Sequence, residues 1–372
     1  MNRYPPLPVA LITAIGFAAR AATTPAVETG ADVQFSPDIT LTQSTVAWFD
    51  RAGRWEWNAA LSGATFQLDY QPVVEDLFGY STTLSQSRVS GLAAFRYAAS
   101  ERLTLLASAS AYNGYADYQS LWINEFYQQS FTGLPGLEEP DPSGVNGSGG
   151  FRWEYRRGTG FVETSLVRAH DVIAPGYDEV IDPDEGLVGV TPLRAEIITL
   201  AWSVKLENAL TRRLRSQLEF RLASQSETGL RLSGIGSLNY APAEHWVVRL
   251  EAGYTTEAPD ELSQAAQFRG GWGALAVNRH FGEHWWLSLS GRGYTDNGEI
   301  QDSISFSTAA PPLSAIQVSL GIRGVWGPHS FKVAGGPYFT DYGAVDFGTL
   351  FFANLYRDRT YGVVQVAYRY EF

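Results

Sequence analysis

The histidines are the residues of this 372-residue chain best able to carry acid–base chemistry, and there are five of them. A hydrolase needs a nucleophile, a base and a group that orients the base. The sequence contains no G-x-S-x-G motif, and spacing assigns no serine or aspartate partner to any histidine. His170 lies near the predicted outer end of a strand, so a hydrolase that uses His170 is kept as the third hypothesis. The favoured expectation is a protein that is not an enzyme and has no catalytic residues.

A metal site and a cofactor are not expected either, and the chain has no cysteine. His280 and His284 are four residues apart, but they flank a predicted turn and do not share a helix face, so the zinc interpretation fails. Acidic residues that could bind Ca²⁺ crowd one predicted outer loop: Asp178, Glu179, Asp182, Asp184 and Glu185. Their spacing is not that of an EF-hand, and a solvated acidic loop is the simpler interpretation.

Alternation with a period of two residues runs through most of the chain from Trp55 onward. The clearest case is residues 198–207, where Ile198, Leu200 and Trp202 share one parity and mostly polar residues occupy the other. A strand places successive side chains on opposite faces, whereas a helix scatters them around its circumference. Aromatic residues at 13% and charged residues at only 18% also favour strands over disorder. The sequence therefore predicts an all-β protein.

The predicted connections alternate between short turns, such as 98–101 and 241–244, and longer loops, such as 117–147 and 173–193. Aromatic residues gather on the strands that flank the short turns: Tyr97, Tyr155, Phe161, Tyr240, Trp246, Trp285, Trp326 and Phe331. A ring of aromatic residues at one level is typical of a barrel that crosses a membrane, where it lies at the interface between lipid and water.

The last predicted strand, residues 360–372, carries the sharpest signature. One parity is apolar and ends in aromatics, and the other carries Gln365, Arg369 and Glu371. As an exposed edge in a soluble protein this strand would invite aggregation, whereas in a closed barrel its apolar face meets lipid. The strand resembles the final strand of Gram-negative bacterial outer-membrane β-barrel proteins, a porin-like class. The resemblance implies that the barrel-assembly machinery binds this strand through an assembly signal, formed by Tyr368, Tyr370 and Phe372.

The predicted architecture is a transmembrane antiparallel up-and-down β-barrel with short periplasmic turns and long outer loops. Counting from Trp55 gives about fourteen strands, and including residues 28–49 gives the alternative of sixteen; both are even, as in single-chain bacterial barrels. The preferred division takes residues 1–21 as a signal peptide, with a basic start, an apolar run and a small-residue cleavage site. Residues 22–50 are then an N-terminal periplasmic or lumenal segment, and residues 51–372 form the barrel.

Charged residues on the polar parity of these strands are expected to line the interior. They are Arg152, Arg156, Arg215, Glu219, Arg221, Arg231, Arg249, Glu251, Arg292, Arg323, Arg369 and Glu371. One interpretation is a polar pore whose charges set selectivity. The other is a ladder of ion pairs that fills and stiffens a closed interior.

These expectations favour a passive channel for small solutes in the bacterial outer membrane, with membrane lipid around the barrel. A closed barrel with a structural or surface-contact role is the alternative. Nucleic acid is not an expected partner, because the net charge of −12 leaves no basic face to replace the counterions of phosphate. A soluble β-sandwich would also alternate, but strands of ten or more residues exceed its usual length of about five or six.

Overall fold

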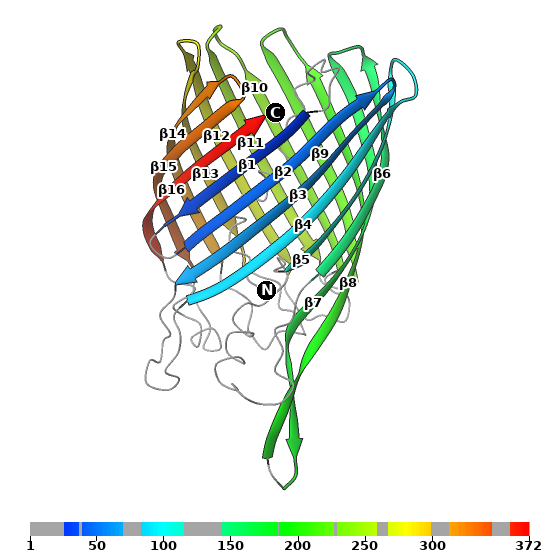
Figure 1. Cartoon of the computed structure of the whole chain (residues 1–372), viewed down its shortest axis with the longest axis vertical. Helices are drawn as coiled ribbons and strands as arrows, with labels where there is room; N and C mark the ends of the chain where they lie inside the picture. Colours follow the sequence, from blue (N-terminus) through cyan, green and yellow to red (C-terminus); the bar gives the residue numbers. More distant parts are fainter. Residues whose placement is uncertain are drawn as a thin grey trace.

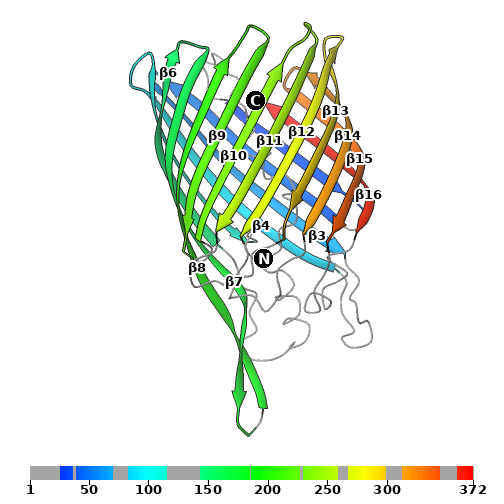
Figure 2. The same ribbon diagram turned by 180° about the vertical axis from the view of Figure 1, so that it is seen from behind.

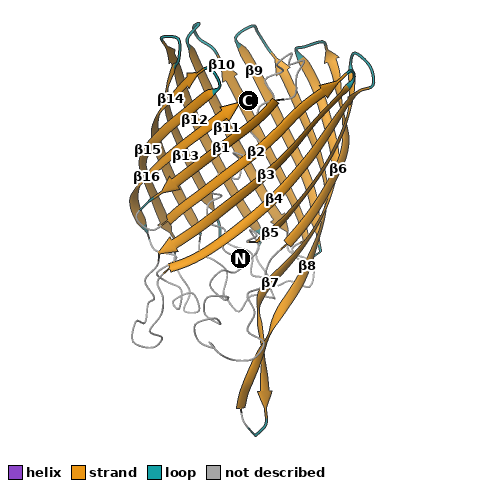
Figure 3. Cartoon of the chain, in the orientation of Figure 1, coloured by secondary structure: helices purple, strands orange, loops and turns teal. Residues whose placement is uncertain are grey.

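The structure is a computed structural model that describes residues 26–36, 39–69, 83–114, 143–184, 186–226, 229–258, 267–298, 312–343 and 358–371. Every regular element in these ranges is a strand, as Figure 3 shows. No helix in the described part is long and apolar enough to cross a membrane. The strands are β1 (Ala26–Phe35), β2 (Ile39–Ala52), β3 (Trp55–Asp69), β4 (Thr83–Ala98), β5 (Leu103–Gly114), β6 (Ser143–Arg156), β7 (Gly160–Asp182), β8 (Gly186–Ala209), β9 (Leu214–Gln225), β10 (Gly229–Tyr240), β11 (Trp246–Ala258), β12 (Phe268–Phe281), β13 (Trp285–Asp296), β14 (Leu313–Trp326), β15 (His329–Tyr342) and β16 (Arg359–Glu371).

The sixteen strands form one closed antiparallel barrel. Each strand pairs with its neighbours in sequence, and β1 pairs with β16 to close the sheet. Figure 1 and the view from behind in Figure 2 show the strands tilted around a single cylinder. Closure leaves no unpaired strand edge, which is what a sheet in lipid requires. The prediction of an all-β, antiparallel membrane barrel is confirmed.

The N-terminal region corrects the preferred strand count. Residues 26–35 and 39–52 form β1 and β2, so they are part of the wall and not a separate periplasmic or lumenal segment. The count is the alternative of sixteen and not fourteen. The physical reason is that β16 would otherwise expose an edge, which β1 covers by pairing from Glu28–Glu371 to Phe35–Val364. The predicted signal peptide, residues 1–21, lies outside the described residues.

The connections differ at the two ends of the barrel. Turns of a few residues join β2 to β3, β6 to β7, β12 to β13 and β14 to β15, and each contains a glycine with positive φ: Gly53, Gly158, Gly282 and Gly327. We call this end of the barrel the short-turn end, and the opposite end the long-loop end. At the long-loop end β7 and β8 continue well past the other strands as one hairpin (Figures 1 and 2). The expectation of an irregular loop over residues 173–193 is therefore wrong, because those residues mostly extend the two strands.

Candidate functional site: the interior of the barrel

The pairing register separates an outer face from an interior face. On β9, Leu218, Phe220 and Leu222 share one parity and are 45%, 58% and 39% exposed. They pair with residues of the same parity class on β8 and β10, such as Leu206 and Gly236 opposite Leu218. Followed from pair to pair, this class continues around the whole barrel. Its large apolar side chains meet lipid, so the other parity faces the interior.

The predicted interior charges fall on the inward parity with one departure. Arg152 lies on β6, while β9 carries Arg215, Glu219 and Arg221, β10 Arg231, β11 Arg249 and Glu251, β13 Arg292, β14 Arg323, and β16 Arg369 and Glu371. Arg156 is the departure. A register shift between Trp153 and Arg156 inserts a bulge, after which Arg156 pairs with Gly160 beside the turn. A bulge resets which face the following residues point to, so simple alternation fails there.

Many of the interior arginines pair with carboxylates. Arg231 contacts Glu257, Arg249 contacts Glu251, and Arg369 contacts Glu28. Looser pairs join Arg152 to Glu154 at 3.8 Å and Arg215 to Glu207 at 4.0 Å, measured between nitrogen and oxygen. Ion pairing therefore accounts for much of the charge on the wall. Arg221 and Arg292 have no carboxylate within ion-pair distance among the described residues.

Sequence reasoning missed the interior residues of β1 because it placed that segment outside the barrel. The Gln365 amide donates to Asp32 Oδ2 at 2.7 Å, and Lys332 Nζ donates to Gln365 Oε1 at 3.0 Å. This chain of contacts crosses β15, β16 and β1 on the inside of the closing seam. The signal was present, since polar Glu28 and Asp32 alternate with Val27, Thr29, Ala31 and Val33 in the sequence.

Small hydroxyl side chains line the middle of the interior face of β3 to β8. The oxygens of Ser62 and Ser90 lie 2.7 Å apart, those of Ser108 and Ser148 2.6 Å, and those of Ser165 and Ser203 2.7 Å. We call these six serines the small-residue arc. The interior charged residues of β9 to β16 and β1 are called the charged arc. The wall thus presents two different chemistries to whatever occupies the interior.

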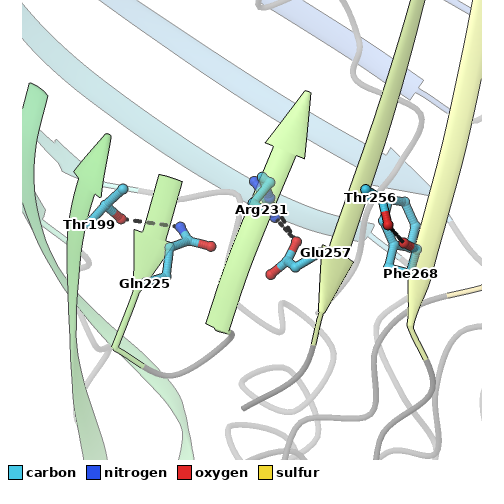
Figure 4. A network of polar contacts seen from close by, with 6 residues as sticks. All are labelled: Thr199, Gln225, Arg231, Thr256, Glu257 and Phe268. Atoms are coloured by element: carbon cyan, nitrogen blue, oxygen red, sulfur yellow. Dashed lines mark hydrogen bonds and ion pairs between the residues drawn. The ribbon is translucent and has the colours of Figure 1, made fainter. Parts of the chain in front are cut away.

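The long-loop end of β8 to β12 holds a buried polar layer, drawn in Figure 4. Gln225 donates to Thr199 Oγ1 at 3.2 Å, and Glu257, which is fully buried, pairs with Arg231. Phe268 is also buried, and its carbonyl accepts a hydrogen bond from Thr256 Oγ1 at 3.1 Å. These inward side chains pack against neighbours and do not face an open lumen. The interior is therefore more enclosed here than along the small-residue arc.

Aromatic side chains cluster at the short-turn end. Trp285 meets Trp326 edge to face with ring centroids 4.8 Å apart, and Trp55 lies 4.6 Å from Tyr97. Phe161, expected in this ring, instead points inward and is buried beneath the guanidinium of Arg152, 3.5 Å from its ring centroid. The parity of its strand was ambiguous in the sequence, and its pairing with Glu207 settles it.

Tyr368 and Tyr370 of the predicted assembly signal lie on the outer face of β16 beside this aromatic cluster. Tyr368 Oη lies 2.8 Å from His329 Nδ1, and the Tyr370 ring centroid is 4.9 Å from that of the same histidine. Phe372 lies outside the described residues. Recognition of Tyr368, Tyr370 and Phe372 by assembly machinery stays a prediction.

His170 lies on the outer parity of β7 and pairs with Ile198. Its Nε2 is 3.2 Å from Glu196 Oε2, and both side chains are exposed. Within the described part of the chain, no serine or threonine hydroxyl forms a hydrogen bond with the His170 ring, so no observation favours the hydrolase hypothesis.

Three of the five acidic residues lie on a strand of the extended hairpin and not in a loop. Asp178, Glu179 and Asp182 belong to β7, and the Asp184 amide donates to Asp182 Oδ1 at 2.8 Å in the turn. Glu185 lies outside the described residues. Among the residues that the structure describes, no group of three or more His, Asp or Glu side chains could hold a metal ion.

Comparison with known proteins identifies the fold. No family model and no curated protein matches the sequence. CdiB from Acinetobacter baumannii superposes with a TM-score of 0.53 at 7% identity, over 95% of this chain and 61% of CdiB, so this chain spans less than two thirds of that protein. A bacterial polysaccharide outer membrane secretin gives 0.49 at 8% identity, over 95% of this chain and all of the other. The toluene transporter TodX from Pseudomonas putida gives 0.45 at 10% identity, over 94% and 90%.

Such low identities show the fold alone, because one fold hosts many functions. Closure of the barrel and the apolar outer face agree with that fold. The protein therefore has the fold of a closed β-barrel with an apolar outer face, which is the arrangement of a barrel that crosses a membrane.

Proposed function

We propose that this barrel is a passive, porin-like channel through which small solutes diffuse along the interior. The observation that carries the proposal is a closed wall of sixteen strands whose interior face is polar. About eight strands already give an interior that side chains can fill, whereas 16–18 strands in porins leave an aqueous channel. A polar interior face against an apolar outer face is the arrangement that water-filled barrels need.

The charges of the interior provide the selectivity in this proposal. The small-residue arc supplies a neutral surface, and its hydroxyl groups are already hydrogen-bonded to one another. In the charged arc, Arg221 and Arg292 remain as cations without carboxylate partners in the described chain. Unpaired positive charge in a confined polar passage attracts anions, so we expect a preference for anions over cations.

Conductance in a planar lipid bilayer tests the channel. We expect steady ohmic steps from the inserted protein, and a reversal potential in a KCl gradient whose sign corresponds to chloride preference. Arg221→Glu should move the reversal potential toward cation preference without abolishing the steps. Ser148→Ala, a neutral change in the small-residue arc, serves as the matched control and should leave the reversal potential unchanged.

The buried polar layer at the long-loop end supports one competing function, a closed barrel with a structural or contact role. Glu257 and Gln225 are enclosed by protein there, and a wall enclosed all round would conduct nothing. Silence from protein that is shown to be folded and inserted, by resistance to protease and by its heat-modifiable mobility in gels, would overturn the channel and favour the closed barrel.

A further inference from the structure

The interior faces of β12 to β16 carry an aromatic and basic patch. It lies on two neighbouring rungs, where a rung is a row of residues paired across adjacent strands. One rung runs through Ala274, Arg292, Gln317, Tyr338 and Tyr361. The next runs through Trp272, Tyr294, Ala315, Thr340 and Arg359. We call these ten positions the aromatic patch. All ten have the inward parity, so side chains from five adjacent strands share one area of the wall.

Arg292 is the centre of the aromatic patch. Its guanidinium carbon lies 4.9 Å from the centroid of the Trp272 ring, which holds the group by a cation–π contact. The other rung neighbours of Arg292 are Ala274 and Gln317, which carry no charge. Arg231, Arg249 and Arg369 differ, because each of them touches a carboxylate. The Trp272 ring therefore orients the Arg292 guanidinium, and no carboxylate of the described residues neutralises its charge, so it can bind an anionic ligand.

The tyrosines supply ring surface that is held in place. The ring centroids of Tyr338 and Tyr361 are 5.1 Å apart with an interplanar angle of 38°. Tyr294 is fixed by donating its hydroxyl to Asp296 Oδ2 at 2.6 Å. Ala315 lies between Tyr294 and Thr340 and is only 5% exposed, so the neighbouring side chains pack over it. Rings held in this way offer flat surfaces against which a planar molecule can pack.

We propose that the aromatic patch binds small carboxylates that carry a planar ring, as the solute site of the channel proposed above. The Arg292 fork would take the carboxylate by two parallel N–H···O bonds, since guanidinium geometry matches that of a carboxylate. Tyr338 and Tyr361 would contact the ring. A neutral ring compound would form no ion pair with Arg292. An aliphatic carboxylate of the same charge would form the ion pair but would have no ring to pack against the tyrosines. Both parts of the ligand are therefore needed.

Equilibrium binding of benzoate to the folded protein in detergent micelles tests the site, with isothermal titration calorimetry as the readout. We expect benzoate to bind more tightly than acetate and than benzyl alcohol. Arg292→Gln should weaken benzoate binding about tenfold or more, because a hydrogen-bonded charge contributes about 1.5–3 kcal/mol and each 1.4 kcal/mol is tenfold. Trp272→Leu should weaken it less, and Arg292→Lys should restore it only in part.

Arg221→Gln is the matched control. Arg221 and Arg292 are each the eighth residue of a strand that begins at the short-turn end, but Arg221 has no ring contact among the described residues. Arg221→Gln should leave the dissociation constant for benzoate within about twofold, far less than the tenfold step expected from a lost charged hydrogen bond. Equal loss from both arginine variants, or acetate binding as tightly as benzoate, would reduce the patch to general anion attraction and overturn the proposal.

The two proposals fail separately. Ohmic steps with no calorimetric signal for benzoate would refute the site and keep the channel. Benzoate binding in a protein that conducts no current would refute the channel while showing that the patch binds its ligand. If both hold, benzoate should reduce the open-channel current of the unaltered protein in a concentration-dependent way, and that reduction should be lost with Arg292→Gln.

Discussion

The small-residue arc and the charged arc are built on the same barrel with the same pairing rules, yet they satisfy their polar groups differently. In the small-residue arc each hydroxyl finds its partner directly across the strand pair, as Ser165 finds Ser203. In the charged arc partners lie along one strand, as in Arg249–Glu251, or across a pair, as in Arg231–Glu257. Short side chains are satisfied by register alone, whereas long ones also need a neighbour of the right charge.

The difference has a consequence for the interior space. The paired serines keep the middle of the interior face of β3 to β8 low, whereas arginine, tyrosine and tryptophan side chains project from the interior face of β12 to β16. A solute inside the barrel would therefore contact mainly the long side chains of the charged arc. Beside the short serines of the small-residue arc it would have free space. If the barrel conducts, as proposed above, the small-residue arc would add to the width of the passage and the charged arc would contribute most to its selectivity.

The first prediction is that the two arcs differ only on the interior face, so that the outer faces behind them respond alike to an added charge. Leu218 lies behind the charged arc and Leu166 behind the small-residue arc, and both are well exposed on the lipid side. Leu218→Arg and Leu166→Arg should each lower the free energy of unfolding by about 2–4 kcal/mol if they lie near the bilayer midplane. Denaturant unfolding in lipid vesicles, followed by tryptophan fluorescence, measures the loss.

Gln217→Arg, one residue away on the inward parity, is the control for that prediction. It adds the same charge to the polar side of the wall and should cost less than about 1 kcal/mol, because lumenal substitutions are tolerated. Equal losses from Leu218→Arg and Gln217→Arg would show that the assignment of the two faces is wrong.

The second prediction separates the buried part of the charged arc from its open part. Glu257→Gln removes the charge that faces Arg231 in a fully buried position and should lower the unfolding free energy by about 2–3 kcal/mol. Glu251→Gln breaks a pair with Arg249 that is partly exposed, and should cost no more than about 1 kcal/mol. The same unfolding experiment compares the two variants. Similar losses of unfolding free energy would mean that water reaches the polar layer at the long-loop end.

Most of the fold was predictable because most of the barrel strands alternate without interruption. The two-residue alternation assigned Ile198 and Leu200 to the outer face, and it identified correctly which side chains of most strands face the interior. The strand count failed at β1, where residues 26–35 carry few large apolar side chains and look like a weak segment when read alone. Their role comes from β16, whose edge they cover, and that requirement appears only when the barrel is considered as closed.

The interior site was predictable in part. Alternation identified charged residues such as Arg221 and Arg292, but it could not show which of them have partners. It failed at Arg156, where a bulge shifts the register, because one extra residue leaves no mark on composition. The aromatic patch was missed because Trp272, Tyr294, Tyr338 and Tyr361 are far apart in sequence, and only the register of five strands sets them on neighbouring rungs.

The smallest effect is expected in the small-residue arc, and it gives the sharpest comparison with the charged arc. Ser62→Ala removes one hydroxyl of the Ser62–Ser90 pair and should lower the unfolding free energy by about 0.5–1 kcal/mol, the usual net value of one neutral hydrogen bond. Ser90→Ala should cost about the same, and the double variant should cost little more than either, since both changes remove one shared bond. Fully additive losses would mean that each hydroxyl bonds water independently. The small-residue arc would then be a solvated surface and not a row of paired serines, and its contrast with the charged arc would lie in charge alone.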